Sequence, residues 1–352
     1  MTRIADVSLL RMLLRFREPV RYAGAWLSTQ QVAVLRLATD DGVVGHGEVT
    51  RATLPGDVEA DVVRARHQLL GTDPSDIGEI DGPLGAAVDT AVLDVLGRIG
   101  GHSVATLLGG GVESVGVNAL LIVSGTPDQD AAAACALVDA GYLTLKLKPT
   151  VTGSLIGTSL RAIRDAVGPG IALRLDLNGQ LAEADAIKRL MTLESIGLEY
   201  VEQPVAPSLG TAALTRVRGS IPMPLAADES VTDLAAACAL LDARACDVLV
   251  VKPSRVGGPR ASVRIARAAA AAGVAVTIST MYESGIGLAT ALQVAATLPG
   301  GRAHGLGTLA LLESDLIGGS LQIVDGRMSL PLGAGLGVTL DPAANLPQPA
   351  RP

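Results

Sequence analysis

Between residues 144 and 253 the chain repeats one pattern five times, in the runs TLKLK (144–148), LRLDLN (173–178), EYVEQP (199–204), LAADES (225–230) and DVLVVKP (247–253). Each run is mainly apolar and ends in charged or polar residues, and successive ends are about 24 to 28 residues apart, the length of one strand, one helix and two loops. Apolar strands that are each followed by a helix predict a parallel sheet buried on both faces. In a β/α barrel, charged residues at the carboxyl ends of the strands indicate the face that carries the chemistry.

The same pattern continues on both sides of these five runs. Further strands are expected at 117–123, 274–281 and 303–306, which makes eight, most of them separated by helical segments such as 128–140. Eight strands favour closure into a β/α barrel over an open doubly wound sheet. A dinucleotide-binding sheet is disfavoured, because no GxGxxG opens a helix after a strand.

The first part of the chain reads as a separate α+β unit. Strand-like runs are expected at 4–15, 31–39 and 43–49, with a turn at Asp40-Asp41-Gly42, and helices at 57–71 and 84–100. Residues 316–340, with Asp325-Gly326 as a turn, are strand-like again and could return to this first unit.

The composition excludes several classes of function. With 352 residues, 49% of them hydrophobic but only 2% aromatic, the chain can bury a large interior that small aliphatic side chains must fill. A net charge of −7 without a dense Lys/Arg run argues against nucleic-acid and anionic-membrane partners. No apolar run approaches the ~20 residues that span a bilayer, and the N-terminus has no signal-peptide pattern. Cys135, Cys238 and Cys246 lack CxxC spacing, which suits free thiols in the cytoplasm.

Three acids end consecutive expected strands. Asp176, Glu202 and Asp228 would therefore lie side by side on one rim of a barrel, where they would repel one another without a cation. Three carboxylates suit Mg²⁺, with Mn²⁺ as an alternative ion, whereas Zn²⁺ would call for Cys or His. A single acid at this place is as well explained as a helix N-cap, but three in phase favour a metal site.

Lysines lie on both sides of these acids. Lys146 and Lys148 alternate with leucines, so the period of two places both on the interior face of their strand, at the mouth of the barrel. Lys146 and a bound metal would lower the pKa of Lys148 towards that of a useful general base. Lys252 ends a strand on the opposite side of the ring, so the two lysines could take and return a proton on opposite faces of one carbon. Taken alone, Lys252 could be a solvated strand end.

As an ordered set, the motifs KxK (146–148), DxN (176–178), VEQP (201–204), ADES (227–230) and VKPxxxGG (251–258) resemble the enolase superfamily, and most closely its muconate-lactonizing-enzyme subgroup. The likeness extends from GxGE (45–48) to Gly337. It implies an α+β capping domain at 1–114, a modified, TIM-like β/α barrel at 115–315 and a segment at 316–352 that returns to the capping domain. It also implies Mg²⁺ on the three acids and proton abstraction α to a carboxylate, giving a metal-stabilised enediolate, with an acid/base pair formed by Lys148 and Lys252.

Within this subgroup, the runs STMYESGIG (279–287) and HGLGTL (304–309) resemble o-succinylbenzoate synthase of menaquinone biosynthesis, a lyase that removes water. That resemblance implies Lys148 as base and then acid, and Lys252 as a stabilising cation. N-acylamino-acid racemases, dipeptide epimerases and muconate cycloisomerases share nearly all these residues and stay open as alternatives. Dipeptide epimerases usually carry an Asp-x-Asp pair after the last barrel strand, which binds the ammonium group of the substrate. No such pair follows the last expected strand here, so the epimerase is disfavoured. A catalytically silent barrel kept as a binding protein is the alternative from a different class.

The partner that the sequence predicts is a small-molecule carboxylate, and the oligomeric state is left open. In the resembled family two capping-domain loops select the substrate, here about Glu18–Thr29 and about Thr50–Gly56. Trp26 could contact the substrate or only cover the domain interface. The further residues expected to bind the substrate or to support the site are Arg21, Tyr22, Lys146, Asn178, Glu229, Ser279 and Glu283.

Overall fold

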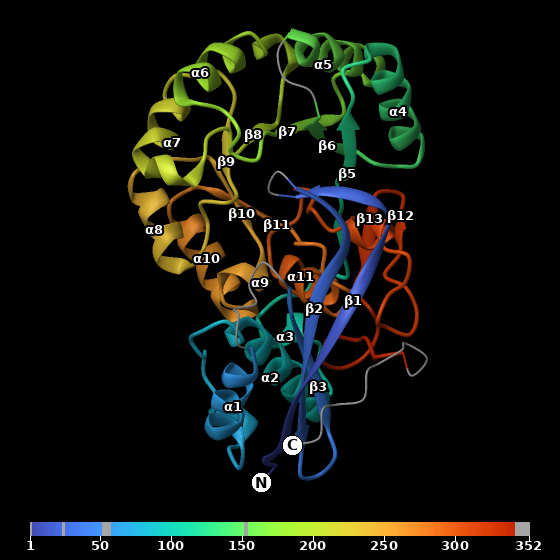
Figure 1. Cartoon of the computed structure of the whole chain (residues 1–352), viewed down its shortest axis with the longest axis vertical. Coiled ribbons are helices and arrows are strands. Elements are labelled where there is room, and N and C mark those ends of the chain that lie inside the picture. Colours follow the sequence, from blue (N-terminus) through green and yellow to red (C-terminus); the bar gives the residue numbers. More distant parts are fainter. Residues whose placement is uncertain (1, 23–24, 51–57, 151–153, 342–352) are drawn as a thin grey trace.

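The computed structural model describes residues 2–22, 25–50, 58–150 and 154–341, and it places a small antiparallel domain against a β/α barrel (Figure 1). The N-terminal sheet has the order β1-β2-β3. Its strands are β1 (Ile4–Tyr22), β2 (Ala25–Thr39) and β3 (Val44–Thr50), and they are followed by α1 (Val58–Leu69), a short 3-10 turn at Pro74–Asp76 and α2 (Gly85–Gly100). Both helices lie where the apolar spacing of the sequence predicts them.

The hairpin of β1 and β2 is longer than the sequence pattern indicates. The sequence predicts a loop at about Glu18–Thr29, but β1 continues to Tyr22 and β2 already begins at Ala25. This prediction was wrong because the register shifts between Arg15 and Val20, and such an irregularity interrupts the strict alternation from which a strand is recognised. The lengthened hairpin reaches from the small domain towards β5 of the barrel (Figure 1).

Helix α2 packs directly on β3, with most of its residues buried. Two glycines of β3 allow this approach. A Cβ on Gly45 would lie 2.4 Å from the carbonyl oxygen of Ala91, and a Cβ on Gly47 would lie 1.9 Å from that of Ala87. The GxG of the GxGE motif is therefore required by contact between two backbones, and it places Glu48 on the side of β3 that faces the barrel.

The barrel sheet contains seven parallel strands whose spatial order follows the chain, from β5 to β11. They are β5 (Ala119–Val123), β6 (Thr144–Pro149), β7 (Ala172–Asp176), β8 (Tyr200–Glu202), β9 (Leu225–Ala227), β10 (Val248–Val251) and β11 (Ala275–Ile278). The helices on the outside are α4 (Pro127–Asp139), α5 (Ser154–Val167), α6 (Glu183–Met191), α7 (Gly210–Arg218), α8 (Leu234–Asp242), α10 (Pro259–Ala271) and α11 (Gly285–Ala295). From green α4 to orange α10 they form an arc around the strands in Figure 1. Two further helices are short, α3 (Val104–Leu107) and α9 (Pro253–Val256).

The segment at 303–306, which the sequence predicts as the eighth strand, does not form a strand. Single parallel bridges instead join His304 to Val117, just before β5, and Gly305 to Ser279, just after β11. The segment therefore connects the two edges of the sheet and closes the ring through these bridges alone. Glycine is required at 305, since a Cβ there would lie 2.6 Å from Oγ of Ser279, and glycines weaken a regular strand.

Side chains along the barrel strands alternate as predicted. On β6, Leu145 and Leu147 are fully buried in the apolar layer between strands and helices, whereas Lys146 makes its ion pairs inside the barrel. The interior below is filled by a separate small cluster, consisting of Tyr200, Ala226, Val248 and Val250. Because small aliphatic side chains occupy most of these positions, the chain needs few aromatic residues to fill its core.

The C-terminal segment begins with a hairpin around Asp325-Gly326, the predicted turn, in which both residues have positive φ. This hairpin, β12 (Ile323–Val324) and β13 (Arg327–Ser329), pairs with β4 (Ser114–Gly116) and not with the N-terminal sheet. Its strands are shorter than the strand-like run in the sequence, because most of 316–340 forms irregular turns.

Beyond this hairpin the chain does reach the small domain. Leu336 donates its N–H to Oδ1 of Asp94 on α2 (2.9 Å), and Nη2 of Arg98 donates to the carbonyl of Val338 (2.8 Å). An apolar cluster with members from β1, α11 and this segment joins the three parts. We propose that 1–114, 115–315 and 316–352 are the capping domain, the barrel and the returning segment.

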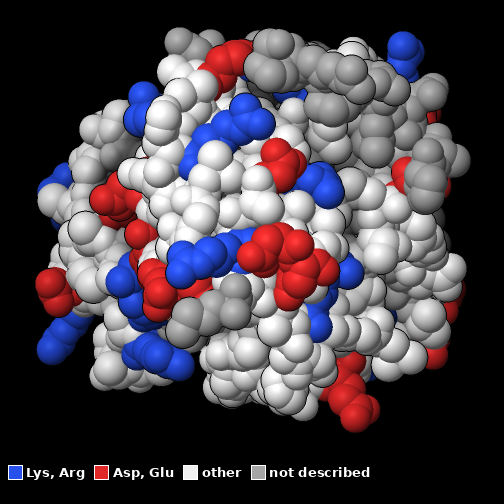
Figure 2. Space-filling view, turned by 90° about the horizontal axis from the view of Figure 1, so that it is seen from below, with Lys and Arg blue, Asp and Glu red and all other residues white. Residues whose placement is uncertain are grey.

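On the face seen in Figure 2, acidic and basic side chains alternate without a broad area of one sign. The three cysteines are free. Among the described residues, none of the helices combines the length and the apolar character needed to cross a membrane. The cytoplasmic location stays a prediction.

Candidate active site

The barrel brings the charged strand ends together as the sequence predicts. Asp176 and Glu202 are the last residues of β7 and β8 and are direct partners in the parallel register. Asp228 follows β9, and Lys252 follows β10 as the N-cap of α9. All three carboxylates are almost completely buried, with 1 to 3% of their surface exposed, so each needs a counter-charge or hydrogen-bond donors nearby.

Residues of the same motifs hold these acids in place. Asn178 has a left-handed backbone (φ 44°) and donates its N–H to Oδ1 of Asp176 at 3.0 Å. Gln203, with φ 40°, accepts hydrogen bonds at Oε1 from the N–H groups of Asp228 (3.0 Å) and Ser230 (3.2 Å). The glutamine of VEQP therefore organises the end of the neighbouring strand. The sequence analysis did not assign it a role, although its place directly after a predicted ligand is a usable signal.

In this structure basic side chains neutralise the three acids. Nζ of Lys146 lies 2.7 Å from Oε1 of Glu202 and 3.1 Å from Oδ2 of Asp176, so one ammonium group bridges two strand ends. Asp228 is bound from the other side, where Nζ of Lys252 lies 2.6 Å from its Oδ2 and Nη1 of Arg255 lies 2.9 Å from its Oδ1. The sequence analysis missed Arg255, which is three residues beyond Lys252 and therefore on the same side of α9.

The electrostatics of this cluster differ from group to group. Burial raises the pKa of Glu202 to about 8, in spite of the Lys146 ammonium, and the nearby acids act in the same direction. Burial opposes the ionisation of Asp228 too, but Lys252 and Arg255 hold the pKa of that carboxyl below its ordinary value. Burial would lower the pKa of Lys146, yet the Asp176 and Glu202 carboxylates hold it well above the usual range. Lys146 is thus a permanent cation, which suits a supporting role.

Lys148 differs from the other two lysines. Burial lowers its pKa, and the charges of Lys146 and Lys252 act in the same direction, against the effect of Asp176. Among the described residues Lys148 has no ion-pair partner, so its amine is available to a substrate. The sequence predicts that neighbouring positive charge lowers the pKa of Lys148. In the structure, burial of Lys148 is the largest cause of the lowered pKa.

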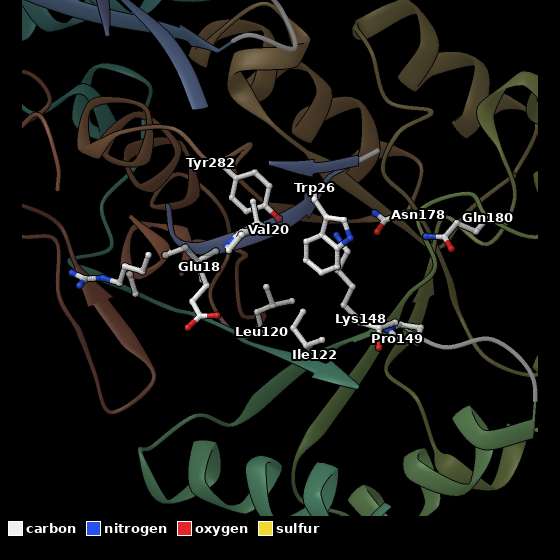
Figure 3. Close-up of a pocket in the computed structure, with 15 residues that line it drawn as sticks. Glu18, Val20, Trp26, Leu120, Ile122, Lys148, Pro149, Asn178, Gln180 and Tyr282 are labelled. Carbon is white, nitrogen blue, oxygen red and sulfur yellow. The ribbon is translucent and has the colours of Figure 1, made fainter. Parts of the chain in front are cut away.

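Lys148 also lines a cavity of about 970 Å³ at the mouth of the barrel. In Figure 3, Trp26, Val20 and Tyr282 approach the cavity from one side and Leu120 and Ile122 from the other, while Lys148, Asn178 and Gln180 lie at one end. Trp26 is 67% exposed and lines this cavity, and its contact with a substrate stays a prediction. A large apolar cavity with a few polar groups at one end is the usual form of a small-molecule site.

Other residues named from the sequence have different surroundings. The backbone of Arg21 pairs with Trp26 and that of Tyr22 with Ala25, but the side chains of Arg21 and Tyr22 lie outside the described part of the structure. The second expected substrate loop extends from Thr50, the last residue of β3, into 51–57, which also lie outside it.

The expected supporting residues lie behind the acids. Nδ2 of Asn178 donates to Oδ2 of Asp176 (3.3 Å) and to Oε1 of Glu229 (3.0 Å). Ser279 contacts the Gly305 carbonyl at 3.5 Å and so belongs to the ring closure. Glu283 is buried and accepts a hydrogen bond from Oγ of Ser254 at 2.6 Å. These contacts connect the site to its frame, while the roles of the residues in catalysis stay predictions.

The donor set fits a hard divalent cation, although its present arrangement does not form a metal site. Among the described residues, no group of three or more His, Cys, Asp or Glu is arranged to hold a metal ion. The ammonium of Lys146, however, already stands between two carboxylates as a cation would. Oε2 of Glu229 is buried and has no hydrogen-bond partner in the described part of the chain. A set of carboxylate oxygens without Cys or His suits Mg²⁺.

Comparisons with known proteins agree with this fold and identify its family. The family model described as "Enolase C-terminal domain-like" matches residues 129–344. The model described as "Mandelate racemase / muconate lactonizing enzyme, N-terminal domain" matches residues 4–82. Chloromuconate cycloisomerase CbnB of Cupriavidus necator is 30% identical over 348 residues, covering 92% of this chain and 93% of the relative. The o-succinylbenzoate synthase of Thermobifida fusca is 35% identical over 218 residues, covering 61% of this chain and 66% of the relative.

Solved structures share the whole architecture. Muconate lactonizing enzyme from Pseudomonas fluorescens, complexed with muconolactone, has a TM-score of 0.87 at 28% identity and covers 97% of both chains. Dipeptide epimerase from Enterococcus faecalis V583, complexed with Mg and the dipeptide L-Leu-L-Tyr, has a TM-score of 0.85 at 26% identity, covering 96% of this chain and 99% of that one. The capping domain and the modified barrel thus coincide with those of the solved structures, and the chain belongs to the enolase superfamily, as an enzyme of its muconate-lactonizing-enzyme subgroup.

Proposed function

We propose that the protein is a Mg²⁺-dependent enzyme that removes a proton from the carbon α to a substrate carboxylate, with Lys148 as the base. The observation that carries this proposal is the position of Lys148, which lies between the apolar cavity and the buried acids, and whose pKa is lowered by burial and by the charges of Lys146 and Lys252. A base must be partly deprotonated near neutral pH to accept a proton, and only a lysine whose ammonium form is disfavoured meets this condition.

The other residues have complementary roles in this proposal. Asp176, Glu202 and Asp228 would hold the metal. Mg²⁺ would supply a positive charge that offsets the negative charge developing on the substrate carboxylate. Lys252 lies on the opposite side of the ring, next to Asp228, and presents a cation to the other face of the reacting carbon. Lys146 keeps two of the acids close together and disfavours the charged form of Lys148.

Within this class, we propose dehydration to o-succinylbenzoate as the reaction. That substrate has two carboxylates and a large apolar body, and the cavity offers apolar walls from Trp26, Leu120 and Ile122 with Arg17 also on its lining. Of the two relatives reported above, the o-succinylbenzoate synthase has the higher sequence identity, 35% against 30%, although it matches fewer residues, 218 against 348. In the reaction, Lys148 takes the α-proton and then returns a proton to the hydroxide that leaves from the β-carbon as water.

Cycloisomerisation of a muconate is the second candidate, because relatives with that name match almost the whole chain. The muconate lactonizing enzyme structure contains muconolactone within the same architecture. Both reactions transfer a proton to or from the carbon α to a carboxylate, so the residues named above could serve either reaction. The choice between them depends on the capping hairpin and the cavity walls, which periodic patterns in a sequence do not describe.

The experiment supplies the purified protein and Mg²⁺ with three substrates in parallel. These are the cyclohexadiene precursor of o-succinylbenzoate, cis,cis-muconate and N-succinyl amino acids. We expect loss of water from the first, with formation of an aromatic product. Formation of a lactone from the second, without turnover of the first, would move the assignment to a cycloisomerase. Rapid racemisation of the third alone would move it to a racemase.

The general chemistry has its own test. If Lys148 is the base, a Lys148→Ala variant loses about 10²–10⁴-fold in kcat on whichever substrate reacts. Binding of these substrates with neither turnover nor α-proton exchange in deuterated water would favour a binding protein and would refute the proposed chemistry.

A further inference from the structure

Contacts from the capping domain end on the two segments that lie next to Lys252. One is the corner Glu283-Ser284, between β11 and α11, and the other is α9, which begins directly after Lys252. We infer that Glu48, on β3 of the capping domain, is a positioning residue for Lys252. Its importance for catalysis rests on the proposed function, whereas the contacts themselves do not.

Glu48 holds the N-terminal end of α11. Its side chain is buried, and Oε1 accepts a hydrogen bond from the N–H of Ser284 at 2.9 Å. Oε2 accepts from Oγ of Ser284 and from the N–H of Gly287 at 3.1 Å. The first N–H groups of a helix have no partner within the helix, and a carboxylate is favourable there. A residue more than two hundred positions earlier in the chain therefore supplies the partner that the barrel segment needs.

Glu283 transmits this constraint to α9. It is 2% exposed, accepts from Oγ of Ser254 at 2.6 Å, and accepts from the N–H of Met281 with its other oxygen. A Cβ on Gly287 would lie 2.4 Å from the Cβ of Glu283, so the two residues are in direct contact and no side chain fits between them. While Glu48 holds Gly287, Glu283 has no room to move towards α11.

Ser254 lies in the first turn of α9, two residues after Lys252. Helix α9 has four residues, too few to be stable by its own hydrogen bonds, so its orientation depends on outside contacts. Among those contacts are the Ser254–Glu283 hydrogen bond and the Arg255–Asp228 ion pair, beside the buried side chains of Pro253 and Val256. The direction of the Lys252 side chain, which ends 2.6 Å from Asp228, follows from how α9 is held.

A second acid of the capping domain holds the other end of the same segment. Oδ2 of Asp89, on α2, accepts from the N–H of Arg260 at 2.9 Å, in the first turn of α10. A Cβ on Gly258 would lie 2.7 Å from that same oxygen, which explains why the VKPxxxGG motif ends in glycine. The segment from Lys252 to Arg260 is thus held directly by Asp89 at its far end and, through Glu283, indirectly by Glu48 at its near end.

The test measures how fast the amines of Lys252 and Lys148 react with acetic anhydride in the whole, metal-free protein, resolved by peptide mass spectrometry. In Ser254→Ala and in Glu48→Gln we expect Lys252 to react about 10-fold faster, the equivalent of one lost hydrogen bond to a charged group. Lys148 should react at an unchanged rate, because it belongs to β6 and makes none of these contacts.

Asp94→Asn is the matched control. Asp94 is a similarly buried carboxylate of α2 that accepts from the N–H groups of His46 and Leu336 and from Nε of Arg98, and among the described residues none of these partners belongs to α9. We expect both lysines to react in this variant as they do in the unchanged protein. Acceleration of both lysines alike, in any of the variants, would show general loosening and overturn the inference. An unchanged acetylation rate of Lys252 in Ser254→Ala would also overturn the inference. This variant changes the side-chain volume less than Glu48→Gln does.

The acetylation rates of the two lysines are measured without any substrate. Failure to turn over any of the three substrates would therefore refute the proposed function without deciding whether Glu48 positions Lys252. Where turnover is found, a double-mutant cycle adds a second readout. Ser254→Ala should lower kcat about 10-fold in the unchanged protein. It should have no further effect in a Lys252→Ala background, because it acts through that lysine. Losses that multiply in the double variant would contradict the inference.

Discussion

Replacing Lys146 by methionine should destabilise the metal-free protein and make its stability depend on Mg²⁺. The Lys146 ammonium contacts Oε1 of Glu202 and Oδ2 of Asp176, and both acids are at most 3% exposed. Removal of one partner from a buried ion pair typically costs about 3–5 kcal/mol, because the remaining charge stays buried. Methionine keeps most of the volume, so the cost is mainly electrostatic.

The pKa of Glu202 places the expected value at the lower end of this range. Burial raises that pKa to about 8 even beside the ammonium, so at pH 7 much of the Glu202 carboxyl is protonated and loses little when the ammonium is removed. The lost ion pair with Asp176 then accounts for most of the cost. We therefore expect a loss of about 3 kcal/mol in the free energy of unfolding at pH 7, and a larger loss at pH 9.

Urea unfolding with and without Mg²⁺ measures this prediction without any need for a substrate. A ligand that binds only the folded state raises its stability in proportion to its affinity, and the uncompensated acids of the variant should bind Mg²⁺ more tightly than those of the unchanged protein. Mg²⁺ should therefore stabilise Lys146→Met more than it stabilises the unchanged protein. Arg216→Met, which removes an exposed ion pair with Glu183, is the control and should be unaffected by Mg²⁺. An unchanged unfolding free energy in metal-free Lys146→Met, or an equal effect of Mg²⁺ on both proteins, would refute the reasoning.

Three further predictions concern pH, the cavity and the domain core. The pKa of the Glu202 carboxyl is raised from its ordinary value to about 8 in the folded state. The contribution of this group to the free energy of unfolding is therefore fully present below about pH 4.5 and is lost as the pH rises through 8. Urea unfolding of the metal-free protein should show a decrease in the free energy of unfolding from pH 5 to pH 9, and an increase would contradict the prediction. Trp26→Ala removes an exposed cavity wall, so KM should rise about 10-fold with the melting temperature unchanged, and an unchanged KM on the active substrate would exclude substrate contact. Gly47→Ala places a Cβ 1.9 Å from the Ala87 carbonyl and should cost about 3 kcal/mol in urea unfolding, whereas Gly42→Ala, at a position with free space but positive φ, should cost about 1 kcal/mol; equal losses would show that contact with α2 is not the cause.

The ring of charged strand ends could be predicted because it depends on local, periodic information. A strand that is buried on both faces and followed by a helix has a nearly constant length of chain, so Asp176, Glu202 and Asp228 recur in phase. Alternation with a period of two separated Lys146 and Lys148 from Leu145 and Leu147, and the structure shows the leucines in the outer layer. The helices α1, α2 and α4 lie where the apolar spacing places them for the same reason.

The prediction was wrong where contacts between distant residues override the local pattern. The run at 303–306 has the apolar pattern of a strand, yet it only forms single bridges to the sheet edges at Val117 and Ser279. The reason is that this closing segment contains glycine, including Gly305 at the contact with Ser279, and glycines weaken a regular strand. The β1–β2 hairpin extends through the expected loop. At its register shift after Arg15 it pairs with residues about 300 positions later, through the Phe16–Leu312 bridge and the hydrogen bond from the N–H of Glu313 to the carbonyl of Arg15.

By itself, then, the sequence determined the order of the strands, the face of each strand that carries charge and the identity of the acids and lysines at the rim. These properties follow from the spacing of residues along one strand or one βα unit, which is set by backbone geometry. Only the tertiary structure decided which cation neutralises which acid, that Lys148 alone faces the apolar cavity, and that Glu48 reaches the start of α11. Such contacts join residues that are tens to hundreds of positions apart, and their geometry depends on how the domains dock, for which no period in the sequence exists.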